Sequence, residues 1–289
     1  MIFWRIIDNK LYHVDEVEKL GFEQSEGLRI PDEYLESQQF TILRMAHGIG
    51  DWGIISAMPR LLKEKYPDCK VYVSSKEMVY SLLSYSHNNM EIIFKNNPYV
   101  DSFKDYIRGE IFHDHYRIYE KDNPNVPLVE QILKFWQFEP NEYVDNKPEL
   151  YWSDKEIGIG DSIISETVGS DEFGALLISD RFGTQCGKYD EKSYNSDTEK
   201  ITKVLKDNPL PYFYYSFKQL KDTPFNFINK ALDLRHMDIR IQLYIRSKAK
   251  LNVGNQCGTM QTVCRYSEVH TAQRQFPIGG NFIKNEIYL

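Results

Sequence analysis

The sequence predicts an α/β protein of two doubly wound domains that face each other across a cleft. Two observations indicate this fold class. A strand, a glycine-containing turn, an amphipathic stretch and a second strand follow one another from residue 41, and the same rhythm restarts at residue 173. The length of 289 residues is also more than one compact core usually takes. We expect an extension over 1–38, a first domain over 39–150 and a second domain over 151–289.

The first domain is expected to open with a strand–helix–strand unit. Residues 41–46, TILRMA, are apolar on both faces, as buried parallel strands are. Apolar residues then recur at helical spacing as far as Tyr66, and the helix is expected to stop before Pro67. Residues 69–75, CKVYVSS, form the next strand. The connection should therefore be right-handed and the sheet parallel.

The spacing of apolar residues and the position of turn residues predict further elements of the first half. They are a helix over 76–86, a strand over 90–94, a turn and short strand over 96–103, and an amphipathic helix over 127–138 with proline in its first turn. Residues 139–156 are rich in proline, asparagine and acids and show no sustained period, so they are expected to link the domains.

The second half repeats the alternation of strands and helices. Ser196 and Glu199 form a capping-box pattern, which predicts that a helix starts there and runs to residue 207. The other expected elements are strands over 173–179, 211–217 and 250–255, a helix over 238–249, and a turn into a helix over 256–267.

Composition excludes several classes of protein. The formal net charge is −7, and no Lys/Arg cluster is long enough to neutralise a polynucleotide backbone, so no nucleic-acid partner is expected. A single nucleotide diphosphate stays compatible, because helix N-termini bind phosphate without net positive charge. The four cysteines form no CxxC pair and no zinc spacing, which favours reduced thiols in a cytoplasmic protein. The apolar N-terminal stretch is too short for a signal peptide or a membrane span.

The turn after the first strand, Gly-Ile-Gly-Asp at 48–51, combines two glycines with an acid. Ligands of doubly wound sheets bind beyond the carboxyl ends of the strands, where such turns lie, and glycine lets a ligand approach the backbone. Asp51 would stand at or near the N-cap of the next helix. It could be an ordinary helix cap or a carboxylate of a binding site. An NAD-dependent Rossmann enzyme is a further, less favoured alternative.

Several segments together are similar to one enzyme family. The run LRMAHGIGDWGIISAMPRLLKEKYPDCKVYV, residues 43–73, resembles the opening of glycosyltransferase family nine, the ADP-heptose–lipopolysaccharide heptosyltransferase group. The likeness continues in FKNNPYVDSF at 94–103 and PLVEQILKFWQFEP at 127–140. It returns in DIRIQLYIRSKAKLNVGNQCGTMQTV at 238–263 and covers most of residues 41–265.

The resemblance implies the GT-B fold, with an N-terminal acceptor domain and a C-terminal nucleotide-sugar donor domain, both Rossmann-like. It implies transfer of a sugar from a nucleotide-diphosphate donor to a glycan or lipid-linked acceptor, as in lipopolysaccharide biosynthesis. Inversion of configuration, no essential metal and no cofactor beyond the donor are also implied. A lipid-linked acceptor would bring the enzyme to a membrane surface. By analogy with GT-B enzymes, residues 275–289 are expected to return to the first domain.

The resemblance also assigns roles to the first turn. The family's catalytic acid falls on Asp51, as the base that deprotonates the acceptor hydroxyl. A sugar hydroxyl is a poor nucleophile, and a carboxylate within hydrogen-bond reach can take its proton as the new bond forms. The residues beside it on the acceptor side are His47, Gly48, Ile49 and Gly50.

The donor diphosphate is implied to bind at the turn over 254–260. The family's G-N-D-T-G here reads Gly254, Asn255, Gln256, Cys257 and Gly258. The Asp and Thr are thus replaced by Gln256 and Cys257, and Gln261 takes the place of a histidine. Gly258 and the amides of Thr259 and Met260 could still hold phosphate through the backbone.

Two further groups of residues have alternative interpretations. Lys188 and Lys192 are candidates for the lysine on the phosphate side, or are solvated surface lysines. His113 and His115 share one face of a strand, but no third metal ligand is evident near them, so no metal site is expected. The altered turn also fits a nucleotide-sugar-binding protein of the same fold that has lost catalysis.

Overall fold

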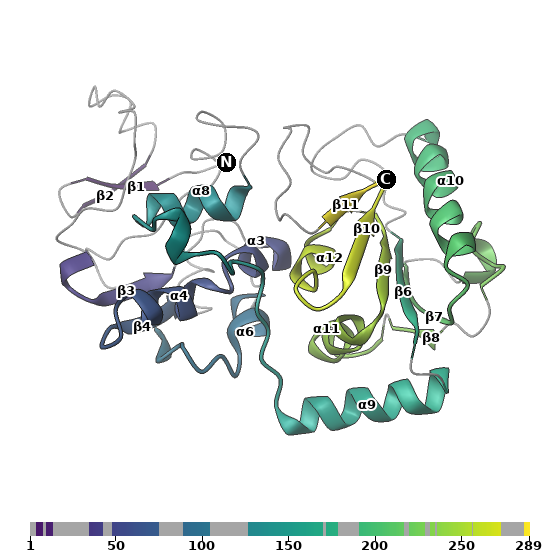
Figure 1. Ribbon diagram of the computed structural model, residues 1–289, viewed down its shortest axis with the longest axis horizontal. Helices are drawn as coiled ribbons and strands as arrows, with labels where there is room; N and C mark the ends of the chain where they lie inside the picture. Colours follow the sequence, from purple (N-terminus) through teal and green to yellow (C-terminus); the bar gives the residue numbers. More distant parts are fainter. Residues whose placement is uncertain are drawn as a thin grey trace. The chain divides into compact units, whose positions relative to one another are not determined.

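The computed structural model divides into two compact units, one ending at Tyr151 and the other beginning at Trp152 (Figure 1). It describes residues 4–7, 10–13, 35–42, 48–74, 89–104, 127–169, 172–178, 191–216, 220–228, 232–234, 236–255, 257–272 and 286–289.

The first unit contains a parallel sheet of three strands in the order β3-β4-β5. They are β3 (Gln39–Ile42), β4 (Lys70–Ser74) and β5 (Ser102–Lys104). The strands predicted near 41, 70 and 103 are therefore confirmed, together with their parallel pairing. A separate antiparallel pair joins β1 (Trp4–Ile7) to β2 (Lys10–His13).

The helix expected after the first strand is two helices, α3 (Ile49–Ile54) and α4 (Met58–Lys65). Pro59 lies in the first turn of α4, where a backbone N–H would have no acceptor inside the helix, so proline costs no helical hydrogen bond there. The chain turns between the two helices, with Met58 N–H donating to the Ile55 carbonyl at 3.0 Å. The predicted apolar positions from 54 to 62 are buried, so the break leaves this packing face intact.

The strand predicted over 90–94 is wrong, because this segment forms helix α6 (Asn89–Phe94). Met90, Ile93 and Phe94 are fully buried, and Phe94 packs edge-on against Trp52 of α3 with ring centroids 6.2 Å apart. A short apolar run fits a strand and a buried helical turn equally well, and here tertiary contact decides.

The segment over 94–103 contains an acid with a structural role. The Asp101 carboxylate accepts hydrogen bonds from the Val71 amide at 2.8 Å, from Lys63 Nζ at 2.8 Å and from Lys70 Nζ at 3.2 Å. Partial burial by itself would raise the pKa of Asp101, but these bonds lower it to about 2. Asp101 therefore links β4 to Lys63 of α4.

Helix α8 (Leu128–Phe135) confirms the amphipathic helix predicted at the end of the first half, with Pro127 as its N-cap. A single 3-10 turn (Pro140–Glu142) follows it. Glu149, which is buried, then accepts a hydrogen bond from Arg60 of α4 at 2.6 Å.

The second unit contains six parallel strands in the order β8-β7-β6-β9-β10-β11, which is 3-2-1-4-5-6 in chain order. They are β6 (Gly174–Ile178), β7 (Tyr212–Ser216), β8 (Leu232–Asp233), β9 (Leu251–Gly254), β10 (Glu268–Thr271) and β11 (Glu286–Tyr288). This is the strand order of the doubly wound nucleotide-binding sheet. The end of the chain was expected in the first domain, and that expectation is wrong for 286–288, which pairs with β10 here.

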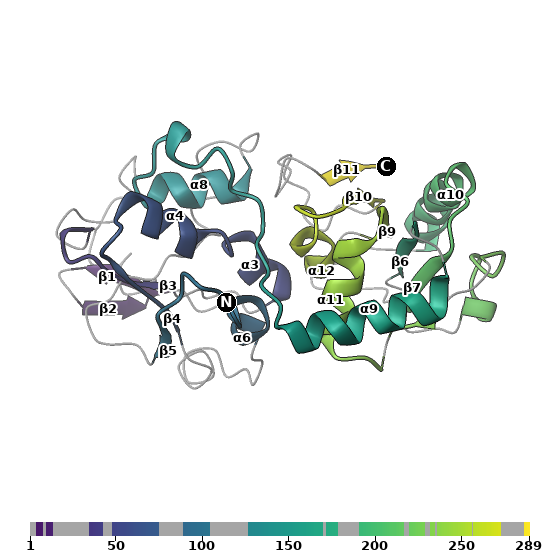
Figure 2. The ribbon, with the colours of Figure 1, turned by 60° about the horizontal axis from the view of Figure 1, so that its bottom comes forward.

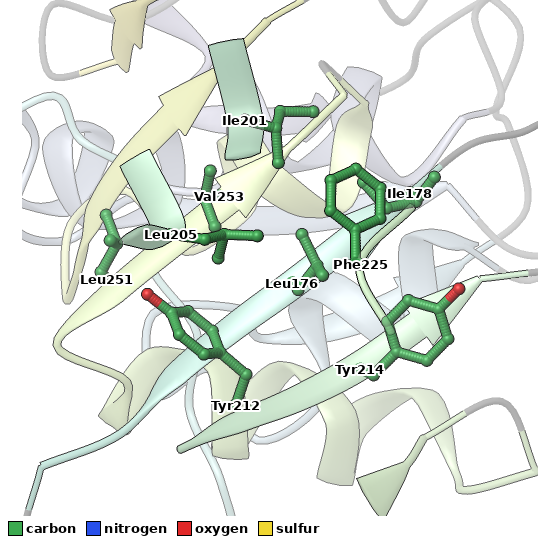
Figure 3. Packing of buried hydrophobic residues seen from close by; sticks show 9 residues of the cluster. All are labelled: Leu176, Ile178, Ile201, Leu205, Tyr212, Tyr214, Phe225, Leu251 and Val253. Atoms are coloured by element: carbon green, nitrogen blue, oxygen red, sulfur yellow. The ribbon is translucent and has the colours of Figure 1, made fainter. Parts of the chain in front are cut away.

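Helices cover both faces of this sheet (Figures 1 and 2). On one face α10 (Glu191–Asp207) supplies Ile201 and Leu205 to the cluster of buried residues shown in Figure 3. On the other face α9 (Asp154–Val168) and α11 (Ile239–Lys248) pack on a second cluster that includes Phe173 and Phe213. Strand β6 serves both clusters because its side chains alternate between the faces.

Helix α9 was not predicted, and its first residues were assigned to the linker. Its N-terminus is a capping box, in which Ser153 Oγ accepts from the Glu156 amide and Glu156 accepts from the Ser153 amide at 2.8 Å. Only Glu156, Gly160 and Val168 are buried along it, so its apolar period is weak. Helix α10 also starts five residues earlier than predicted, which places Ser196 inside it rather than at its cap.

Candidate functional site

The strand order of the second unit places its switch point between β6 and β9. From this pair the chain continues toward opposite edges of the sheet, and ligands of doubly wound sheets bind beyond the carboxyl ends of such a pair. The two carboxyl ends are Ile178 and Gly254. The 254–260 turn directly follows β9, so it starts at the switch point.

Gly254 is required by the way β9 packs against β6. A Cβ atom at this position would lie 1.8 Å from the carbonyl oxygen of Leu177, and the residue has φ +156°. The amide of Asn255 donates to the same carbonyl at 3.0 Å, and the amide of Ala272 donates to the Gly254 carbonyl at 2.9 Å. The start of the turn is therefore fixed by backbone contacts to both neighbouring strands.

The turn ends in a short helix, α12 (Gly258–Thr262), with Cys257 as its N-cap. The Met260 amide donates to the Cys257 carbonyl at 2.9 Å, so it is engaged inside the helix. The amides of Gly258 and Thr259 have no acceptor in the described part of the chain. Of the three backbone positions expected to hold phosphate, two thus present open N–H groups.

The side chains around the turn are mostly packed. Asn255, Met260 and Gln261 are buried, and Cys257 Sγ lies 3.2 Å from Thr259 Oγ1. Gln256 lies outside the described residues. In the described part of the turn, the open hydrogen-bond donors are therefore the backbone amides of Gly258 and Thr259.

The lysine candidates belong to the connection that follows β6. Lys192 lies in the first turn of α10, the helix that leaves the other strand of the switch point. Lys188 lies outside the described residues.

Sequence reasoning missed a charged residue beneath the turn. Arg246, in the last turn of α11, is 3% exposed. Its Nε donates to Asn252 Oδ1 at 3.2 Å, and its Nη2 lies 2.8 Å from Met260 Sδ on α12. No sequence signal could have found it, since an arginine on a helix is normally at the surface.

In the first unit the turn at 48–51 begins α3, with Gly48 as N-cap and Asp51 as the third helical residue. Asp51 Oδ2 accepts a hydrogen bond from the Gly48 amide at 3.0 Å, and the residue is half-buried. Asp51 therefore caps its own helix from inside the first turn rather than from the N-cap position. Gly50 is buried and Ile49 is half-buried, while His47 lies outside the described residues.

The described ranges contain no group of three or more His, Cys, Asp or Glu side chains arranged to hold a metal ion. His113 and His115 lie outside them. No helix in the same ranges has both the length and the apolar character needed to cross a bilayer.

Comparison with known proteins gives a match in structure only. Neither protein-family models nor curated proteins match the sequence. A solved glycosyl transferase family 9 structure from Veillonella parvula DSM 2008 superposes with a TM-score of 0.53, at 7% identity, over 92% of this chain and 88% of that one. The chain has the fold of a family 9 glycosyltransferase. This confirms the α/β fold class predicted from the sequence.

Two further solved structures are similar at lower scores. E. coli heptosyltransferase WaaC with ADP has a TM-score of 0.44 and 10% identity over 86% of this chain and 92% of that one. The iron-containing dodecameric glycosyltransferase TibC from enterotoxigenic E. coli H10407 has a TM-score of 0.45 and 9% identity over 86% and 61%.

Proposed function

We propose that the protein is a cytoplasmic glycosyltransferase that moves a sugar from a nucleotide-diphosphate sugar to a glycan or lipid-linked acceptor. The reaction inverts configuration and uses no metal. The observation that carries this proposal is the position of the 254–260 turn at the switch point of a 3-2-1-4-5-6 sheet, with two amides left open. The fold shared with a family 9 glycosyltransferase supports it.

The 254–260 turn is proposed to hold the donor diphosphate. Open N–H groups at the start of a helix stabilise phosphate oxygens, and the stabilisation grows as the diphosphate leaves with the electron pair of the glycosidic bond. Gly258 and Thr259 provide these groups. Either Lys188 or Lys192 adds a positive charge on the β6 side of the switch point.

Asp51 is proposed to act as the base. One carboxylate oxygen accepts the Gly48 amide, which fixes the orientation of the side chain. The Asp51 carboxylate accepts the proton of the acceptor hydroxyl as that hydroxyl bonds to the anomeric carbon. Attack from the side opposite the leaving diphosphate inverts the configuration.

A second candidate function is nucleotide-sugar binding without transfer. The hydrogen bond between Gly48 and Asp51 accounts for the acid as a helix cap, with no need of catalysis. The Gln, Cys and Gln at 256, 257 and 261 likewise leave a turn that binds through its backbone.

A mass-spectrometric screen of nucleotide sugars, followed by assays of Asp51→Asn, separates these functions. Asparagine can still accept the Gly48 amide, so the variant is expected to fold and to bind donor as the parent protein does, but to lose transfer. Asp238→Asn is the matched control, because Asp238 caps α11 by accepting the Arg240 amide at 2.8 Å. Unchanged transfer in Asp51→Asn would remove the base role, and donor binding without any transfer by the parent protein would favour the second function.

A further inference from the structure

Arg246 is a buried charge with no countercharge among the residues that the structure describes. It is 3% exposed, and its hydrogen-bond partners are the side chains of Asn252 and Met260, both neutral. No carboxylate bonds to it in the described ranges. A guanidinium carries five N–H donors, so these two contacts leave most of its capacity unused.

The same helix provides a comparison. Arg240, six residues earlier on α11, is 4% exposed and pairs with Glu156 of α9, through Nε to Oε1 at 2.5 Å and Nη2 to Oε2 at 3.3 Å. Helix α11 therefore buries two guanidinium groups, of which one is neutralised inside the protein. Burial of an ion is unfavourable unless an opposite charge compensates it, so Arg246 calls for a charge from another source.

The surroundings of Arg246 indicate where that charge would be. The guanidinium contacts Met260 inside α12, and it interacts electrostatically with Cys257, the N-cap of α12, and with Tyr215 near the carboxyl end of β7. Burial lowers the pKa of Arg246, whereas negative charge on either neighbour would raise it. The positive charge thus lies beneath the turn whose open amides belong to Gly258 and Thr259.

We propose that Arg246 supplies the positive charge for a diphosphate bound at the 254–260 turn. The proposal rests on the proposed function and names the residue that fixes the charge of its ligand. Because Arg246 is buried under α12, it is a positioning residue that acts through the turn rather than by touching the ligand. It offers a charge where the turn itself has only neutral side chains at Asn255, Cys257 and Thr259.

The test measures binding by isothermal titration calorimetry with inorganic pyrophosphate, and with ADP, GDP and UDP beside their nucleosides. Arg246→Met removes the charge and keeps an apolar side chain of similar length, and Arg246→Lys restores the charge. Lys248→Met is the matched control, since it removes an exposed charge from the same helix. We expect Arg246→Met to weaken pyrophosphate and the preferred nucleoside diphosphate about tenfold or more. Nucleoside binding should stay unchanged, Arg246→Lys should recover most of the affinity, and Lys248→Met should change it less than twofold.

Thermal unfolding without ligand separates this role from a structural one. Since an uncompensated buried charge is replaced by an apolar group, Arg246→Met should unfold at the same temperature as the parent protein or higher. If Arg246→Met does not fold, Arg246→Gln keeps a donor toward Asn252 without the charge and should show the same loss of diphosphate affinity. Equal diphosphate binding by the folded variants, or loss of diphosphate and nucleoside in the same proportion, would overturn the proposal.

The failure of this inference differs from the failure of the proposed function. If pyrophosphate binding depends on Arg246 but no nucleotide sugar binds, the proposed anion site stands and the proposed glycosyl transfer is refuted. Nucleotide-sugar binding that is unaffected by the charge at 246 would keep the proposed function and remove the inference. A parent protein that binds neither pyrophosphate nor nucleotide overturns both.

Discussion

Replacement of Gly254 by alanine tests whether the start of the 254–260 turn is fixed by the sheet. The new Cβ would lie 1.8 Å from the Leu177 carbonyl oxygen, and ordinary contact begins at 3.4 Å, so β6 and β9 would have to separate by about 1.6 Å. That movement breaks the bond from the Asn255 amide to Leu177, which contributes about 1 kcal/mol. The unfavourable φ adds about 1–3 kcal/mol. We expect the second unit to lose about 2–4 kcal/mol of stability.

The assay is native-state hydrogen exchange read by mass spectrometry, because it reports the second unit separately from the first. Gly158→Ala is the control, since a Cβ at Gly158 on α9 would meet nothing within 4 Å. Alanine there should stabilise α9 by about 0.5–1 kcal/mol. If Gly254→Ala leaves exchange in β6 and β9 within about 0.5 kcal/mol of the parent protein, the close approach of the two strands does not hold the turn.

Three further predictions concern stability. Arg240→Met should cost about 3–5 kcal/mol in urea unfolding, because Glu156 is left buried without its partner, and Arg240→Met together with Glu156→Leu should recover most of the loss. Gly160→Ala should cost about 1–3 kcal/mol, since its Cβ would lie 2.2 Å from the Tyr244 ring; a neutral effect would contradict the packing of α9 on α11. Asp101 and Glu156 both have a pKa lowered to about 2, and partial burial opposes the hydrogen bonds that lower it. These two carboxylates therefore stabilise the folded protein fully above about pH 4.5, and that stabilisation is lost as the pH falls toward 2. Asp101→Asn should make the free energy of unfolding fall less steeply at acid pH. An unchanged acid dependence would refute this.

Local patterns predicted the strands and helices that have long, regular signals. The β4 and β6 segments are apolar runs bounded by turn residues, and α11 begins at Asp238, whose side chain accepts the Arg240 amide. Such elements need no knowledge of their neighbours, because period and capping specify them.

Other elements depended on contacts that a single segment does not reveal. The run at 90–94 is helical because Phe94 packs on Trp52, although the two residues are far apart in the sequence. Helix α9 has a clear capping box at Ser153, but its weak apolar stripe concealed it, and its pair between Glu156 and Arg240 joins residues far apart in the sequence. Neither contact can be read from a local pattern.

The candidate site was predictable to the extent that it lies on backbone turns. The glycines at 48 and 254 marked both turns, and the strand order placed the second one at the switch point. The position of Arg246 under α12 could not be predicted, because it depends on how α11 and α12 pack against β9.

Hydrogen exchange at the amides of Gly258 and Thr259 tests the central claim most directly. With the nucleotide sugar that the protein binds best, peptides covering 257–262 should exchange more slowly, whereas peptides from β7 and α9 should not change. Protection confined to other segments, or protection by NAD in place of every nucleotide sugar, would contradict the claim that this turn holds a sugar-nucleotide diphosphate.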